Sequence, residues 1–155
     1  MANYDENKSK PQITKELFRR WRDAREQWDA EARNAVDFTL GNHYSTDESD
    51  ALQAVGQADF VIDRVYAAVD KLKSLLTARP ARFSVIARED SDNKLANVWR
   101  TILEYVWDIS NGDSTFKQVV HDYAVTGLGY MYVYIDPEAD YGRGEVKYTH
   151  VDPFR

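Results

Sequence analysis

A long amphipathic segment near the N-terminus constrains the fold of this chain more than any other feature. Apolar and small residues recur at steps of three, four and seven between positions 14 and 40, namely Leu17, Trp21, Trp28, Ala32, Ala35 and Thr39. This spacing is typical of a helix with one apolar stripe. Such a helix is about 40 Å long. Because a small globule cannot cover a stripe of that length, we expect the helix to pack against something larger.

The two ends of this helix carry recognisable signals. Thr14 follows Pro11 and is a plausible N-cap, since its hydroxyl could accept from the first free amides. Gly41 suits the left-handed residue that closes a helix. Residues 1–13 are polar and of mixed charge, which differs from a secretory signal. We interpret them as a flexible N-terminal arm before one domain over residues 14–155.

Composition places the chain among soluble globular domains and excludes several classes. Its 155 residues are 43% hydrophobic and 30% charged, enough for a real core. The absence of cysteine excludes disulfides and thiolate sites. The longest apolar run, 130–135, is too short to cross a membrane. A net charge of −6 argues against a general nucleic-acid-binding surface.

The remaining elements predict an α+β fold. Residues 42–59 are polar and broken by Gly56, which favours an exposed loop with room for one helical turn. Helical patterns follow over 63–78, over 95–109 with caps at 90–92 and a stop at Asn111 and Gly112, and after a cap at Ser114. The segment 81–87 alternates as a short strand does, and 130–151 predicts a β-hairpin.

No catalytic, cofactor or metal site is evident. His43, His121 and His150 are far apart in sequence and lack a partner at ligand spacing. The chain has no phosphate loop, nucleophile elbow or paired-histidine zinc motif. The acidic run 47–50 lacks the spacing and distal glutamate of a calcium loop. We therefore predict no catalytic residues, no cofactor and no metal.

The stretch VTGLGYMYVYID contains two glycines that could suggest a phosphate cradle. A dinucleotide fingerprint runs from strand through glycines to helix, whereas here a helix comes first. We predict that Gly127 closes the preceding helix in the left-handed conformation. We predict that Gly129 allows the strand to leave at close backbone approach.

Two sets of residues are candidates for contacts between subunits. Trp21 and Trp28 lie seven residues apart on one helix face, where they could form intramolecular core or anchor a subunit contact. Arg64 and Lys71 belong to a basic strip that continues to Arg88 but includes acidic residues, so it could also be an ordinary solvated face. Both alternatives stay open for each set.

The order of motifs resembles the N-terminal part of tailed-bacteriophage portal proteins, of the group that includes the podovirus portals. The long helix ends in an aromatic, glycine, aromatic signature at Phe38, Gly41 and Tyr44. The family often shows Gln and Trp after this glycine, and His43 and Tyr44 depart from that form. The segments FVIDRVYAAVDKLKSLL, RPARFSVIA, the G-x-G corner and HVDPF then follow in order, over residues 14–154. Family members often carry Asn at the position of Asp63.

This resemblance implies a structural role in the virion rather than catalysis. The protein would form a homo-oligomeric ring, usually of twelve subunits, at one capsid vertex, and would bind terminase, capsid and tail adaptor proteins. DNA would pass through the ring with little direct binding by this segment. The ring would assemble in the host cytoplasm. Since stem, clip and tunnel loop are absent, we expect the chain to be a wing fragment of a longer protein.

Two other functions remain open at this point. One is a small helical head–tail adaptor or scaffolding-type protein that works as a complete chain. The other is a nucleic-acid-processing enzyme whose site the sequence does not reveal. A native mass that corresponds to a closed ring would favour the portal hypothesis. A compact monomer with salt-sensitive DNA affinity would count against it.

Overall fold

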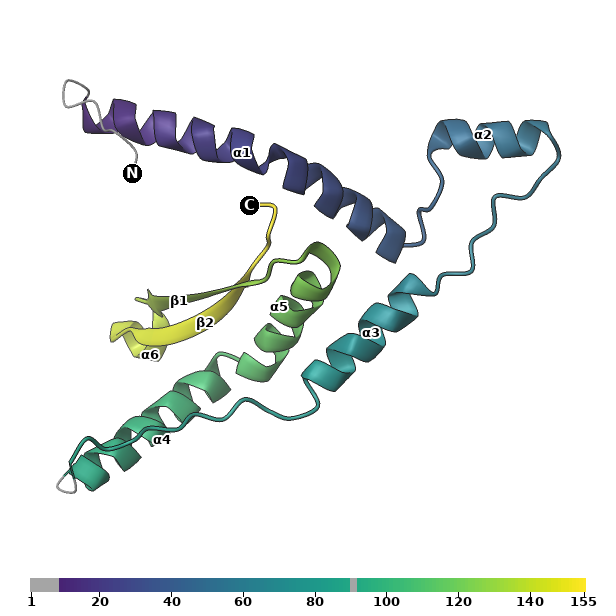
Figure 1. Ribbon diagram of the computed structural model, residues 1–155. Helices are drawn as coiled ribbons and strands as arrows, with labels where there is room; N and C mark the ends of the chain where they lie inside the picture. Colours follow the sequence, from purple (N-terminus) through teal and green to yellow (C-terminus); the bar gives the residue numbers. More distant parts are fainter. Residues whose placement is uncertain (1–8, 90–91) are drawn as a thin grey trace.

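The computed structural model describes residues 9–89 and 92–155. Its elements are α1 (Lys10–Thr39), α2 (Thr46–Ala54), α3 (Val65–Leu76), α4 (Asn93–Ile109), α5 (Gly112–Thr126), β1 (Tyr130–Asp136), α6 (Ala139–Gly142) and β2 (Glu145–Val151). Figure 1 shows α5 and the hairpin between α1 and α4, while α2 stands apart on an extended arm. The predicted α+β class, with its long N-terminal helix and C-terminal hairpin, is confirmed.

The first helix begins earlier than its sequence pattern predicted. Ser9 is the N-cap, and its backbone N–H donates to the Gln12 side chain at 3.0 Å. The predicted cap at Thr14 is wrong, because the Thr14 hydroxyl donates to the carbonyl of Lys10 inside the helix. Residues 1–8 of the expected arm lie outside the described residues. At the other end Gly41 has φ of 84°, as predicted.

The polar stretch after α1 contains more helix than expected. Thr46–Ala54 forms a nine-residue helix, α2, where we predicted a loop with a single turn. Ser45 accepts from the Glu48 amide, and the Glu48 carboxylate accepts from the Ser45 amide at 2.8 Å. This reciprocal capping box is visible in the sequence as Ser-x-x-Glu. It satisfies backbone amides at the start of α2, which has no buried residue.

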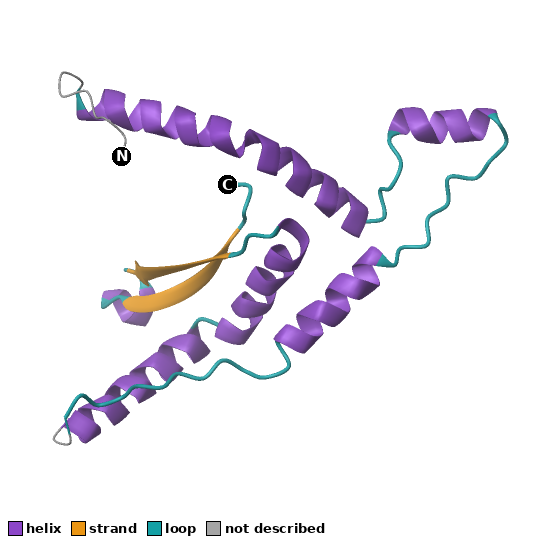
Figure 2. Ribbon diagram, in the orientation of Figure 1, coloured by secondary structure: helices purple, strands orange, loops and turns teal. Residues whose placement is uncertain are grey.

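The third helix and the segment after it agree with the sequence only in part. α3 lies within the predicted range 63–78. Residues 81–87 show the expected alternation, with Phe83, Val85 and Ala87 partly covered and Ser84 and Ile86 exposed. However, the predicted strand does not form, because the described residues give this segment no strand to pair with. Figure 2 shows it as an extended loop that runs along α4.

The buried part of the molecule centres on Trp107 near the end of α4. Its ring lies 5.4 Å from that of Phe83 and 5.6 Å from that of Tyr148, and its indole N–H donates to Asp113 at 3.0 Å. A Cβ on Gly112 would lie 2.2 Å from the ring, so only glycine fits there. Trp107 therefore joins α4, α5, β2 and the loop at 83.

The connection from α4 to α5 is tight and differs slightly from the prediction. Asn111 has φ of 48° and precedes α5, so the predicted cap at Ser114 lies inside the helix and is wrong. Asn tolerates the left-handed conformation better than most residues. The buried Ser110 hydroxyl donates to Val106 and accepts from the Tyr148 amide at 3.0 Å. This bridge ties the corner to β2.

The glycine corner before the hairpin forms as predicted. Gly127 has φ of 78° and its amide donates to the Tyr123 carbonyl, so it closes α5 in the left-handed conformation. A Cβ on Gly129 would lie 2.4 Å from the carbonyl oxygen of Val119. Both glycines are therefore required by backbone geometry.

The hairpin is a regular antiparallel pair from Tyr130↔Val151 to Asp136↔Glu145. Lys147 donates to Asp136 across the strands at 2.7 Å. This hydrogen bond lowers the pKa of Asp136 and raises the pKa of Lys147. The rings of Tyr132 and Tyr134 stack with centroids 5.9 Å apart. The Lys147–Asp136 pair links β1 to β2 and stabilises the end of the hairpin that is farthest from α5. The tyrosine stack lies along β1 alone.

A large part of the chain has no core of its own. No described residue between positions 40 and 105 is buried. The accessible surface is 12716 Å², whereas a compact monomer of this size exposes roughly 8000 Å². The long stripe of α1 thus belongs to an open structure, and the expectation that it packs against something larger stays a prediction.

Candidate subunit-interaction surfaces

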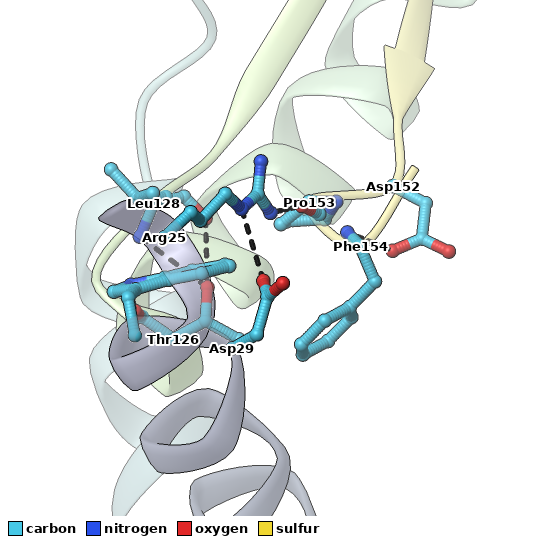
Figure 3. A network of polar contacts seen from close by, with 8 residues as sticks. Arg25, Asp29, Thr126, Leu128, Asp152, Pro153 and Phe154 are labelled. Carbon is cyan, nitrogen blue, oxygen red and sulfur yellow. Dashed lines mark hydrogen bonds and ion pairs between the residues drawn. The ribbon is translucent and has the colours of Figure 1, made fainter. Parts of the chain in front are cut away.

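The second half of α1 is attached to the rest of the molecule through Trp28. Its indole N–H donates to the Thr126 carbonyl at 3.0 Å, and its ring lies 5.7 Å from that of Phe154. Thr126 is the last residue of α5, and its hydroxyl also contacts the Leu128 backbone. Figure 3 shows Thr126 and Leu128 at the end of α5 and Phe154 in the segment after β2. Trp28 therefore packs within the chain, in agreement with the intramolecular alternative.

Charged side chains surround this contact and hold the segment after β2. The Arg25 guanidinium binds Asp29 at 3.0 Å, donates to the Pro153 carbonyl and lies 4.4 Å from the Trp28 ring centre. Arg33 lies 5.0 Å from the ring centre of Phe154. Arginine over an aromatic face contributes most when the pair is partly desolvated. This contact, which we call the α1 seam, fixes the helix to residues 126 and 153–154.

The first half of α1 continues the same stripe, and no segment among residues 9–89 and 92–155 covers it. Trp21 is one heptad before Trp28 but is 65% exposed, and the neighbouring Phe18 is 64% exposed. The structure therefore separates the two tryptophans that the sequence grouped together. Trp21 is exposed and accessible to a partner, whereas Trp28 is partly covered by its own chain. A subunit contact at either residue stays a prediction.

The other interface candidates, Arg64 and Lys71, are both exposed on or beside α3. Their neighbour Lys73 pairs with Asp70 at 2.7 Å, and this hydrogen bond raises the pKa of Lys73. The apolar side of α3 is also open, with Leu75 66% exposed. Positive charge next to exposed leucine is compatible with a contact, but the role of Arg64 and Lys71 stays a prediction.

The most regular apolar stripe in the sequence is also exposed. The side chains on the first three turns of α4 are between 42% and 56% exposed, namely Leu95, Val98, Trp99, Ile102 and Tyr105. A shallow depression lies along this stripe between Asn97 and Tyr105. Contiguous apolar surface of this kind usually marks an interaction site. The helical pattern was correct, although the described chain covers only about half of the surface of these residues.

The described residues show no arrangement suited to catalysis or metal binding. They contain no group of three His, Asp or Glu side chains placed to hold a metal ion. His43 stacks on Phe38, and His150 pairs with Asp122. The buried Nδ1 of His121 has no hydrogen-bond partner in the part of the chain that the structure describes. Of these three histidines, His150 contacts an ionisable side chain, Asp122.

The helices of the described residues also differ from membrane spans. None of them combines the length and the apolar character that a bilayer crossing requires. The longest, α1, carries charged residues throughout. The exposed apolar stripes therefore belong to helices whose other faces are polar.

Several residues that shape these surfaces could not be identified from the sequence. Trp107 lies outside the α4 stripe, and its burial depends on Phe83 and Tyr148, which are distant in sequence. The contact of Arg25 with Pro153 spans 128 positions. No local periodicity encodes contacts between such distant positions. In contrast, Asp63 caps α3 by accepting from the Tyr66 amide at 2.9 Å, a role that Asn could also fill.

A comparison with known protein families identifies the family of this chain. A family model described as phage P22-like portal protein matches residues 15–155. A search of curated proteins gives no match. The matched range includes the α1 seam, the exposed helices α3 and α4 and the complete hairpin. The chain therefore belongs to the family of P22-like phage portal proteins.

Proposed function

We propose that this chain is the outer, wing portion of a subunit in a phage portal ring. The family match over residues 15–155 carries this proposal. The portal family is structural rather than enzymatic, so the proposed role is in assembly and not in catalysis. The intact ring would occupy one capsid vertex, form the channel for DNA entry and exit, and bind terminase and the tail.

The open surface supports an assembled state. The accessible surface exceeds that of a compact monomer of this size by more than half. A standard interface covers about 800 Å² on each partner, so the excess leaves room for several contacts. A ring subunit uses two different surfaces, one toward each neighbour. The family resemblance suggests that the ring has twelve subunits.

The proposed location and partners follow from this assembly. Family membership implies the capsid vertex of a virion. Assembly in the host cytoplasm is part of the proposal. The net charge of −6 is compatible with DNA that slides through the ring without tight binding by this segment. Capsid, terminase and tail adaptor proteins would bind other parts of the ring surface.

Native mass measurement and electron microscopy of the full-length protein test this function. We expect closed rings of one size, with twelve subunits as the leading number. A monomer or an open filament at all protein concentrations and salt conditions would contradict the proposal. Adding a DNA duplex serves as a control, because a ring that forms only on DNA would indicate a nucleic-acid-binding protein.

A further inference from the structure

Two exposed regions of opposite charge lie at opposite ends of α1. Residues 10–25 contain six Lys and Arg but only two acidic residues, whereas residues 42–63 contain five acidic residues and no Lys or Arg. Figure 1 shows the start of α1 and the α2 arm on opposite sides of the molecule. We infer that the basic start of α1, within residues 10–25, binds the acidic segment around α2, residues 42–63, of a neighbouring copy. This inference rests on the proposed ring.

The basic surface combines charge with aromatic anchors. Positions three and four apart lie together on a helix, which places five exposed residues on one side of α1: Lys15, Phe18, Arg19, Trp21 and Arg22. Within residues 9–89 and 92–155, Lys15 and Arg19 form no ion pair, while Arg22 contacts Asp23. Aromatic and arginine side chains are the residues most often found at the centre of protein interfaces. We call this set the basic end.

The acidic surface has the matching composition. It consists of α2 and its flanking loops, residues 42–63, which we call the acidic arm. Its carboxylates form no ion pair with Lys or Arg in the described part of the chain. Val55 and Phe60 are 70% and 71% exposed beside them. The arm thus offers negative charge and apolar contact together, and it has few contacts with the rest of its own chain.

The two surfaces cannot meet within one molecule. From Arg19 to Thr39 the helix is about 30 Å long, because each residue adds about 1.5 Å. Charges attract each other weakly beyond the screening length, which is about 8 Å at physiological ionic strength. The α1 seam holds the second half of the helix in place, so the basic end cannot fold back. A second copy is therefore the occupant that satisfies both surfaces.

The separation of the surfaces also favours a ring. Contact between two basic ends, or between two acidic arms, would be repulsive. Each copy would instead use its basic end on one neighbour and its acidic arm on the other, which is the heterologous contact that closes into a ring. An antiparallel dimer could use the same contact twice, so the size of the assembly distinguishes these arrangements.

Thiol cross-linking tests the contact directly, since the chain has no cysteine. Full-length proteins that carry either Arg19→Cys or Asp47→Cys are mixed in a cysteine-free background and treated with a short bismaleimide. We expect a cross-linked pair in the mixture and no cross-linked pair when either protein is treated alone. Lys117→Cys mixed with Asp47→Cys is the matched control, because Lys117 is an exposed cation on α5. Equal yields in test and control would overturn the inference.

Charge reversal provides a second measurement. Lys15→Glu with Arg19→Glu should eliminate the assembly while the helical circular dichroism is retained, and so should Asp47→Lys with Asp50→Lys. Combining all four changes should restore the assembly. The control pair Arg100→Glu and Lys117→Glu changes the net charge by the same amount at other positions. It should have no effect on assembly. Failure of the combined variant to assemble, with both parents folded, would contradict the contact.

The outcomes separate this contact from the proposed function. Wild-type rings without a specific cross-link would support the portal ring but overturn the contact. A specific cross-link in a protein that stops at a dimer would support the contact and contradict the ring. If a DNA duplex binds the wild type, does not bind the Lys15→Glu, Arg19→Glu variant and blocks the cross-link, the basic end is a nucleic-acid site and the inference is wrong.

Discussion

The part of the chain around Trp107 and the part between positions 40 and 105 differ sharply in how they are stabilised. The first buries Val106, Trp107 and Val120 and joins α4, α5 and β2. The second contains no buried residue among those described. Both have clear helical patterns. The difference shows that a regular apolar stripe predicts a helix but does not say whether its partner lies in the same chain.

The open region has a physical reason to remain open. Helices of 9 to 17 residues are marginal in water unless an apolar face packs against a partner. α3 and the start of α4 expose such faces, so contacts outside the described chain must supply the missing burial. A portal subunit surrounded by neighbours would provide them.

The largest expected difference between the two regions concerns two tryptophans on α4. Trp107→Ala should lower the free energy of unfolding by about 3–5 kcal/mol, because it removes the centre of the core. Trp99→Ala, on the exposed stripe, should change it by about 0.5 kcal/mol or less. Denaturant titration measures both. Equal losses would mean that the stripe is covered within the chain and that the contrast is wrong.

A smaller difference is expected between the two halves of α1. Trp28→Ala leaves the Thr126 carbonyl without its donor and should cost about 1–3 kcal/mol of stability. Trp21→Ala should leave stability unchanged and weaken assembly, since Trp21 is exposed. Melting temperature and sedimentation of each variant separate these effects. A stability loss in Trp21→Ala would show that the first half of α1 is also covered within the chain.

The smallest effect concerns the exposed end of the hairpin. The Lys147 ammonium lowers the pKa of Asp136 below its usual 3.8. A lowered acid pKa stabilises the folded state above that unfolded value, and this contribution disappears as pH falls through the folded pKa. The stability difference between wild type and Asp136→Asn should therefore be constant near neutral pH and shrink below about pH 4. Amide exchange of β1 and β2 measures it.

The Lys147 side of the same pair gives a control at high pH. Because the pKa of Lys147 is raised, the pair contributes to the stability of the folded state below pH 10.5. This contribution disappears as pH rises through the folded pKa of Lys147. Lys147→Met should thus reduce stability between these limits as Asp136→Asn does, since both remove one interaction. A difference that persists unchanged at pH 3 would mean that it does not arise from the ionised Asp136 carboxylate.

Local signals in the sequence were sufficient for most elements. The stops at Gly41 and Gly127, the close approach at Gly129 and the hairpin were all predicted, because each depends on neighbouring residues and backbone sterics. The capping box at Ser45 was equally local, although the acidic composition around it concealed α2. Errors at Thr14 and Ser114 arose because several residues nearby could serve as caps.

The sequence alone thus determined most of the helices, the hairpin and the family resemblance, and it predicted a partner along α1. Only the tertiary structure decided which apolar faces are covered. Trp28 is covered and Trp21 is not, although both lie on one stripe, because Thr126 and Phe154 come from distant parts of the chain and reach only the second half of α1. Periodicity fixes the direction of a side chain relative to its helix, whereas burial depends on contacts between residues far apart in sequence.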